Sequence, residues 1–127
     1  MNNRTKVASR EAVFEDFPEI TNMLRGMGLN FPDGDEDIRA LWDRLWISNP
    51  ALENNNPKLP LGWVLTSSDK IVGVFCNITQ QYSFCGDPLL VAVASMWGIE
   101  KTHRFAIRKL ADSYFNQPDA DLLLTTT

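Results

Sequence analysis

The stretch WGIEKTHRFAIRKL, residues 97–110, combines residue types that could bind an anionic ligand. Its first part predicts the end of a strand and its second part the start of a helix, with basic side chains at the junction. Backbone N–H groups at a helix start point outward and, together with the helix dipole, favour a phosphate. Arg104, Arg108 and Lys109 add positive charge there. The stretch therefore predicts either a phosphate site or an ordinary capped helix with solvated charges.

Two side chains at the same junction could transfer protons. Glu100 follows the predicted strand and could act through a water molecule, and His103 carries the imidazole whose ordinary pKa suits proton transfer near neutral pH. A solvated loop carboxylate and a solvated histidine explain the same residues without catalysis. Glu100 and His103 are therefore candidates only, and the general acid and base stay undetermined.

The composition is that of one globular domain. The chain has 127 residues, of which 44% are hydrophobic and 22% charged, and this length is enough for a single core. No apolar run reaches the roughly 20 residues of a membrane span, and no secretory signal follows MNNRTK, so we expect a cytoplasmic protein without a membrane partner. The net charge of -4 argues against nucleic acid as a principal partner.

The two cysteines do not suggest a metal or disulfide framework. Cys76 and Cys85 have neither the spacing of metal ligands nor the density of a disulfide-stabilised protein. We expect reduced thiols and no metal.

The first half of the chain predicts one strand and two helices. A short strand is expected at residues 6–10, and a helix from about Asp16, where Asp16 and Glu19 have the spacing of a capping box. Apolar residues at helical spacing predict a second helix from Asp35 to Trp46. The proline- and asparagine-rich segment 49–62 is expected to be a long surface connection.

The second half predicts most of a sheet. Segments 62–67, 70–84 and 89–99 are expected to form three antiparallel strands in a meander. A helix at 105–115 then leads to a last strand in 121–127, which should run parallel to its neighbour because a crossover helix precedes it. The sequence thus predicts an α/β protein with a mixed α+β sheet. Its predicted core includes Trp63, Val72, Val74, Val93 and Leu110.

This order of elements, with the segments WVLTSSDKIVGVF, VASMWGIEKTHR and DADLLLTTT, resembles the GNAT superfamily of acyl-CoA-dependent N-acyltransferases. The resemblance extends over the chain from about residue 6 and corresponds to the first two thirds of that family. Family members continue after the fifth strand with a helix, often bearing a tyrosine acid, and two further strands. The resemblance therefore implies a single GNAT-like domain over residues 1–127 that is incomplete at its C-terminus, as a fragment, a natural truncation or a chain completed by a partner.

The resemblance implies transfer of an acyl group from acetyl-CoA to a small-molecule or peptide amine by direct attack. In the family the fourth strand carries a bulge and separates from the fifth, which exposes backbone groups to the pantetheine arm. Here these groups would belong to Trp97 and Ile99, and the N–H of Trp97 would polarise the acyl carbonyl. The alternative is that MWG marks only a bent core strand.

The family's phosphate motif, R/Q-x-x-G-x-G/A, is degenerate in this sequence. Arg104 matches its first residue, but Ile107 and Lys109 stand where glycine would let a diphosphate approach the backbone. The resemblance therefore implies a weakened CoA site. Its expected cofactor-binding residues are Trp97, Ile99, Arg104, Phe105, Ala106, Ile107, Arg108, Lys109 and Thr125.

Two further interpretations stay open. The chain could be a non-catalytic acyl-CoA-binding domain with the same fold, or a protein-interaction domain. The segment Leu122–Leu124 is apolar on both faces of its predicted strand and would present an unpaired edge. We therefore expect self-association through the last strand.

Overall fold

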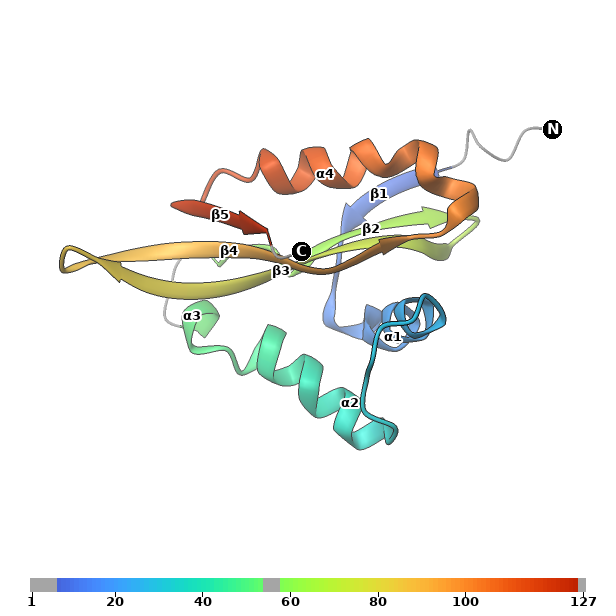
Figure 1. Cartoon of the computed structure of the whole chain (residues 1–127), viewed down its shortest axis with the longest axis horizontal. Coiled ribbons are helices and arrows are strands. Elements are labelled where there is room, and N and C mark those ends of the chain that lie inside the picture. Colours follow the sequence, from blue (N-terminus) through green and yellow to red (C-terminus); the bar gives the residue numbers. More distant parts are fainter. Residues whose placement is uncertain (1–6, 54–57, 126–127) are drawn as a thin grey trace.

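A five-stranded mixed sheet with helices on both faces makes up the computed structural model, which describes residues 7–53 and 58–125 (Figure 1). The strands are β1 (Val7–Glu11), β2 (Gly62–Ser67), β3 (Lys70–Phe84), β4 (Asp87–Ile99) and β5 (Leu122–Thr125), and they are adjacent in this order. Neighbours from β1 to β4 are antiparallel, whereas β5 is parallel to β4. The predicted mixed sheet and its parallel last strand are confirmed.

The helices divide between the two faces of this sheet. On one face lie α1 (Phe17–Gly26), α2 (Asp35–Trp42) and α3 (Pro50–Glu53), and on the other lies α4 (Ile107–Phe115) (Figure 1). Alternate strand residues face each layer. Val64, Val74 and Val93 pack with α1 and α2, while Trp63, Val72 and Leu110 belong to the α4 layer. All five residues predicted for the core are buried.

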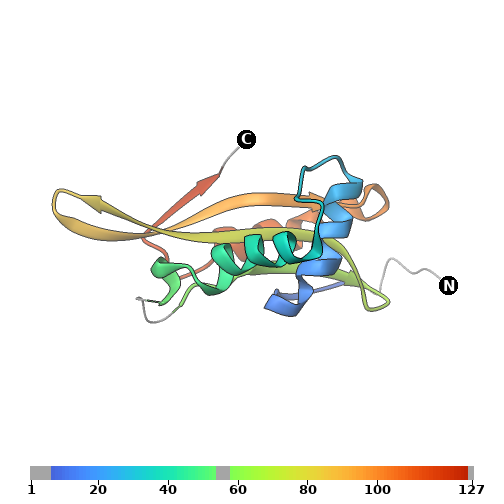
Figure 2. The same ribbon diagram turned by 90° about the horizontal axis from the view of Figure 1, so that it is seen from below.

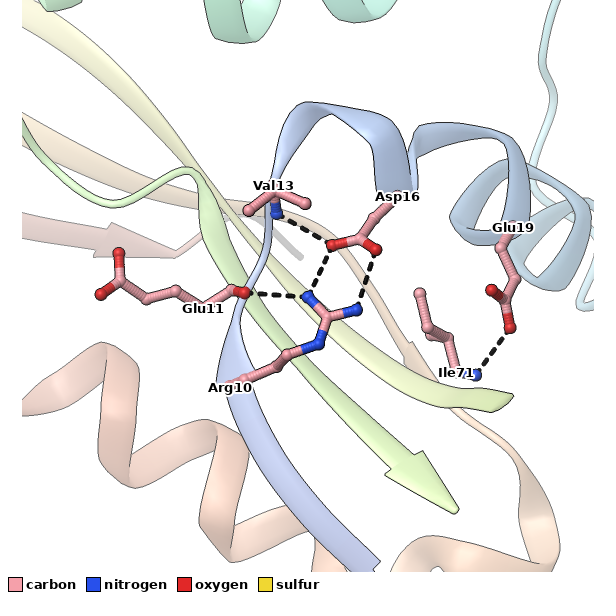
Figure 3. A network of polar contacts seen from close by, with 6 residues as sticks. All are labelled: Arg10, Glu11, Val13, Asp16, Glu19 and Ile71. Atoms are coloured by element: carbon pink, nitrogen blue, oxygen red, sulfur yellow. Dashed lines mark hydrogen bonds and ion pairs between the residues drawn. The ribbon is translucent and has the colours of Figure 1, made fainter. Parts of the chain in front are cut away.

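The start of α1 is where the sequence placed it, but the predicted capping box is wrong. A 3-10 turn, Phe14–Asp16, precedes the helix. The Asp16 carboxylate accepts a hydrogen bond from the N–H of Val13 at 2.8 Å and two from Arg10 at 2.8 and 2.9 Å (Figure 3). Glu19 instead accepts from the N–H of Ile71 on β3 at 2.7 Å. The two carboxylates thus tie the start of α1 to the sheet, Asp16 through Arg10 of β1 and Glu19 through Ile71 of β3. They bind these donors in place of the N–H groups of the first turn of α1.

Three other local expectations need correction. The second helix ends at Trp42 and continues as a π-helical turn, Asp43–Ile47. The segment expected to be a surface connection contains α3, and it buries Ala51, Leu52 and Leu59, although its residues 54–57 lie outside the described part. Asn49 orders this segment by donating to the carbonyl of Thr79 while accepting from the N–H of Ala51.

The helix expected from Phe105 is the third correction. A 3-10 helix over Lys101–Ala106 comes first, and α4 begins at Ile107. Apolar spacing alone does not separate 3-10 from α-helical geometry over so short a stretch.

Candidate functional site

A bulge in β4 is the geometric centre of the candidate site. Phe75 on β3 pairs with Trp97, but the next residue, Cys76, pairs with Ser95, so Met96 is an extra residue on β4. Met96 has φ 55°, in the left-handed region that side chains rarely adopt. A bulge of this kind bends the strand and redirects the residues that follow it.

Side chains on both faces hold the bulge in place. Met96 packs against the core beneath α1 and α2. Trp97 faces the opposite layer, where its ring stacks on Phe75 with centroids 6.2 Å apart, and Phe75 in turn contacts Tyr114 of α4 at 4.9 Å. Half of the Trp97 side chain remains exposed. The alternative that Trp97 is simply a core residue is therefore not what the structure shows.

Strand β5 accompanies β4 only as far as the bulge. The paired residues run from Val91 with Leu122 to Ala94 with Thr125, the last described residue, while β4 continues to Ile99. In Figure 2, β5 runs at an angle to β4 and diverges from it toward the Thr125 end. The buried Tyr114 hydroxyl marks the end of the paired part, since it donates to the carbonyl of Leu124 at 2.6 Å and also lies 2.9 Å from that of Ala92.

The open edge of β4 presents backbone groups at two residues. The N–H of Glu100 donates to the carbonyl of Val72 on β3 at 2.8 Å. Because bonded and non-bonded pairs alternate along an antiparallel ladder, Gly98 also bonds β3, and the N–H and C=O groups of Trp97 and Ile99 point away from it. They point to the side of β4 on which β5 pairs with Val91–Ala94, where the described residues place no strand beside Trp97 and Ile99.

A pocket of about 450 Å³ lies along this edge. It is lined by Met27, Trp97, Gly98, Ile99, Arg104 and Ile107. Met27 follows α1, and a Cβ at Gly98 would come within 2.9 Å of its sulfur. The absence of a side chain at Gly98 therefore lets Met27 lie over the strand. Sequence reasoning missed Met27, because a methionine at the end of a helix carries no signal of a ligand site.

The junction before α4 uses its backbone donors internally. The N–H of His103 donates to the carbonyl of Glu100 at 2.8 Å, and the N–H of Ile107 donates to the carbonyl of Arg104. The 3-10 helix and α4 therefore form one continuous helical segment whose first turn starts at Lys101. The N–H groups without an intrahelical partner, which the sequence places near Arg104, therefore belong to the first turn at Lys101.

The side chains at this junction are mostly exposed. Phe105 is 54% and Ile107 40% exposed, while Ala106 is buried in the core. Arg104, Arg108 and Lys109 are also exposed, and no carboxylate within residues 7–53 and 58–125 forms an ion pair with them. The structure thus places Arg104 and Ile107 on the pocket, and Phe105, Arg108 and Lys109 outside its lining.

The two candidate proton carriers are close to each other. The Glu100 carboxylate lies 3.7 Å from the Nζ of Lys70 and 3.9 Å from the Nδ1 of His103. The same Nδ1 lies 3.0 Å from the hydroxyl of Thr102. Glu100 lines a second, shallower hollow of about 460 Å³, which shares Met27 with the pocket beside Trp97. This arrangement would allow proton transfer but equally describes a surface ion pair.

Two buried titratable side chains take no direct part in the pocket. Burial raises the pKa of the Tyr114 phenol, although its hydrogen bonds to backbone carbonyls oppose that shift. Burial likewise raises the pKa of the Cys76 thiol far above its usual range, so this cysteine is inert at neutral pH. In the described part of the chain, no group of three His, Cys, Asp or Glu side chains could hold a metal ion.

The overall fold matches that of solved acetyltransferases. The fold is that of the GNAT acetyltransferases. An aminoglycoside acetyltransferase from an uncultured soil metagenomic sample, in complex with sisomicin, matches with TM-score 0.60 and 14% identity over 99% of this chain and 80% of its own. A predicted acetyltransferase from Clostridium acetobutylicum with acetyl-CoA matches with TM-score 0.60 and 12% identity over 95% and 80%.

A third GNAT structure extends the range of acceptors in these neighbours. Glucosamine-6-phosphate N-acetyltransferase from Arabidopsis thaliana matches with TM-score 0.60 and 9% identity over 95% of this chain and 82% of its own. No family model and no curated protein sequence matches the chain. The described helices include none that is long and apolar enough to cross a membrane.

Proposed function

We propose that this chain is a GNAT-type N-acyltransferase domain that transfers an acyl group from acetyl-CoA directly to an amine of a small molecule or peptide. One observation carries the proposal. The bulge at Met96 turns the backbone groups of Trp97 and Ile99 toward an open edge beside a pocket. Unpaired backbone groups are costly unless a ligand or water completes them, so this edge is suited to an amide-containing ligand.

The pantetheine part of CoA fits this edge. Its amides would add to β4 as an extra strand does, with an N–H donating to the C=O of Trp97 and a C=O accepting from the N–H of Ile99, which leaves the N–H of Trp97 for the thioester. Its methylene and methyl groups would lie against the apolar side chains of Met27 and Ile107. Arg104, Arg108 and Lys109 would attract the phosphates from the adjoining surface. Phe105 and Ala106 lie between Arg104 and Arg108 in the chain, and Thr125 is the last described residue of β5 that pairs with β4.

The reaction needs only proton transfers besides the acyl transfer itself. The amine nitrogen attacks the thioester carbonyl carbon, a C–N bond forms, and the C–S bond breaks with its electron pair leaving on sulfur. The amine loses one proton and the thiolate gains one. The N–H of Trp97 would donate to the carbonyl oxygen as negative charge develops there. Glu100, acting through water, and His103 are the proposed carriers of these protons.

The proposal is tested by following backbone amides while acetyl-CoA is added. In a ¹H–¹⁵N NMR titration of the full chain, the largest shifts should belong to Trp97 and Ile99, and the ligand should raise the melting temperature. Adenosine 3′,5′-bisphosphate, which lacks pantetheine, should leave both amides unchanged. Shifts confined to surface cations, with Trp97 and Ile99 unmoved, would contradict the proposal.

Charge reversal separates specific from general electrostatic binding. Changing Arg104 and Arg108 to Glu should weaken acetyl-CoA binding several-fold, because both cations adjoin the pocket. The same double change at Arg39 and Arg44 on the α2 side preserves the net charge of the first variant and should leave binding nearly unchanged. Equal losses in the two variants would assign the effect to nonspecific attraction.

A non-catalytic binding domain is the second candidate function. It is favoured by the strand sequence of β4, which contains no glutamate in LLVAVASMWGI, and by the ion pair that occupies Glu100. Thiol release from acetyl-CoA in the presence of an amine panel distinguishes the two. Amide shifts at Trp97 and Ile99 without thiol release would favour binding alone, and loss of thiol release in Glu100→Gln would assign Glu100 a role in the reaction.

We also propose that copies of the chain associate through β5 and that the protein is cytoplasmic. Leu122 is 42% exposed on β5, whose edge opposite β4 carries no strand in the described residues. Such an edge can pair with the same strand of a second copy.

A further inference from the structure

We propose that the donor site recognises the pantetheine thioester and not the diphosphate of CoA, so that donors carried on 4′-phosphopantetheine bind as well as acetyl-CoA. This inference rests on the proposed function, because it concerns the donor of that same reaction. It follows from a difference between the two parts of the site, namely an open strand edge and a closed helix start.

The helix start offers no free backbone cradle beside Arg104. A diphosphate is held at a helix N-terminus by N–H groups that have no intrahelical partner. Here the N–H of Ile107 is bonded to the carbonyl of Arg104, and that of His103 to the carbonyl of Glu100. Within the 3-10 helix each N–H from His103 onward bonds the carbonyl three residues earlier, so outward N–H groups remain only in the first turn, at Lys101 and Thr102, one turn before Arg104. A diphosphate at this place would therefore meet donors that are already paired.

Side chains close the same place sterically. Ile107 and Phe105 are large, and both are partly exposed at the junction. Ile107 also lines the pocket with Trp97 and Met27, so its side chain lies over the end of the pocket where phosphates would continue from a pantetheine arm. A β-branched side chain in this position prevents the close approach that a backbone-bound diphosphate requires.

The remaining attraction for phosphate comes from mobile, solvated cations. Arg104, Arg108 and Lys109 are exposed and carry no ion pair in the described residues. Exposed charges interact weakly and without a fixed geometry, and salt screens them. Because each such contact contributes little, the additional phosphates of CoA give it only a small advantage over the single phosphate of phosphopantetheine.

The pantetheine part of the site shows none of these obstructions. The groups of Trp97 and Ile99 face the open side of β4, and the pocket of about 450 Å³ beside them is lined mainly by apolar side chains. Recognition is therefore concentrated on the part of the donor that CoA and carrier-bound phosphopantetheine have in common. Lys101 and the three other cations lie on the surface that would face a carrier protein, and their charge is complementary to an acidic one.

The experiment compares three donors by calorimetry and by the Trp97 and Ile99 amide shifts. They are acetyl-CoA, acetyl-4′-phosphopantetheine and the same acetylated group attached to an acidic carrier protein. We expect the first two to bind within tenfold of each other. Acetyl-CoA binding more than tenfold tighter would overturn the inference while leaving the proposed function intact. Failure of all three to bind would overturn both.

The carrier protein identifies the source of the phosphopantetheine. Binding at least tenfold tighter than that of the free compound, with the gain lost at high salt, assigns the donor to a carrier protein. Affinity equal to or below that of the free compound assigns it to a small-molecule donor.

A restored motif tests the cause. The double variant Ile107→Gly, Lys109→Gly places glycine at both motif positions, removes the obstructing Ile107 side chain and loosens the helix start, and should tighten acetyl-CoA at least fivefold relative to acetyl-4′-phosphopantetheine. Asp112→Gly, later in α4, provides the control for a glycine in this helix and should leave the ratio unchanged. An unchanged ratio in a folded Ile107→Gly, Lys109→Gly protein would overturn the inference.

Discussion

Two adjoining parts of β4, the first half Val91–Ala94 and the second half Ser95–Ile99, are both largely apolar but have different surroundings. From Val91 to Ala94 the strand is paired on both sides, by β3 and by β5. From Ser95 to Ile99 it keeps β3, gains the bulge at Met96 and has no β5 partner in the described residues. The first half is thereby a structural element and the second a candidate binding edge. The comparison teaches that the availability of the outer backbone groups, more than side-chain chemistry, distinguishes the two.

The largest expected effect comes from removing the support that both halves share. Leu110 is 1% exposed and packs in the layer between α4 and the sheet. Leu110→Ala should lower the free energy of unfolding by about 2–5 kcal/mol in urea denaturation, since it leaves a cavity under the sheet. The exposed neighbour Arg108→Ala should change it by less than about 0.5 kcal/mol. A loss below that value for Leu110→Ala would contradict the packing described here.

Removing the Tyr114 hydroxyl should loosen the pairing of β5 with Val91–Ala94 of β4, which distinguishes this part of the strand from Ser95–Ile99. Tyr114→Phe keeps the ring beside Phe75 but takes away the group that contacts the carbonyls of Leu124 and Ala92. We expect a loss of about 1–2 kcal/mol. Hydrogen exchange should accelerate in β5 and in its β4 partners, while amides of β2 keep their protection. Uniform acceleration throughout the sheet would mean that Tyr114 stabilises the whole fold and does not mark the boundary.

The free energy of unfolding at acidic pH should depend on the hydrogen bonds of Asp16 with Arg10 and Val13, which position α1. Met27, which follows α1, lies over Ser95–Ile99 of β4. Burial of Asp16 alone would raise its pKa, but the hydrogen bonds from Arg10 and from the N–H of Val13 outweigh it and lower the pKa below the usual 3.8. A lowered folded-state pKa gives stability that is present above about pH 4 and lost as the pH falls further.

Asp16→Asn should remove this part of the pH dependence. At pH 7 the variant should be less stable by about 1 kcal/mol, and the difference from the unchanged protein should shrink below pH 4. Urea denaturation at pH 7, 4 and 3 measures it, with Glu15→Gln as the control at an exposed neighbour. A difference that stays constant down to pH 3 would show that the charge of Asp16 does not matter.

The smallest effect concerns the outer edge of β5. If copies pair through this edge, Leu122→Lys should reduce the associated fraction seen by light scattering, because an edge lysine opposes strand addition. Phe84→Ser, at the exposed end of the β3–β4 hairpin, is the control and should leave association unchanged. If the unchanged protein is a monomer at all concentrations, copies of the chain do not associate. If only Phe84→Ser reduces the associated fraction, the copies associate through the β3–β4 hairpin and not through β5.

Much of the fold could be predicted because its signals are local. The meander of β2, β3 and β4 follows from alternating apolar residues and from tight turns, where Ser68 and Asp69, and then Cys85 and Gly86, adopt positive φ. The parallel direction of β5 follows from the crossover helix before it. The α3 turn and the capping of α1 could not be predicted in this way, since Asn49 and Asp16 find their partners on other elements.

Part of the candidate site could likewise be predicted from local signals, and part depends on contacts between distant elements. Arg104, Ile107 and the strand that carries Trp97 and Ile99 could be predicted from residue types and from the order of elements. Met27 also lines the pocket, but it lies far earlier in the chain, just after α1. It can lie beside Trp97 only because Gly98 has no side chain. Whether a cationic helix start has free N–H groups likewise depends on the turn before it.

The sequence by itself determined the meander of β2, β3 and β4, the parallel direction of β5 and the position of the basic junction, because hydrophobic period and turn chemistry act between near neighbours. Only the tertiary structure decided that Met96 is the bulged residue, that the groups of Trp97 and Ile99 face an open edge, and that the donors before α4 are already paired. The physical reason is that a backbone hydrogen bond depends on where the partner strand or turn lies. The amino-acid sequence specifies the donors and acceptors, whereas their pairing is a property of the assembled sheet and helix.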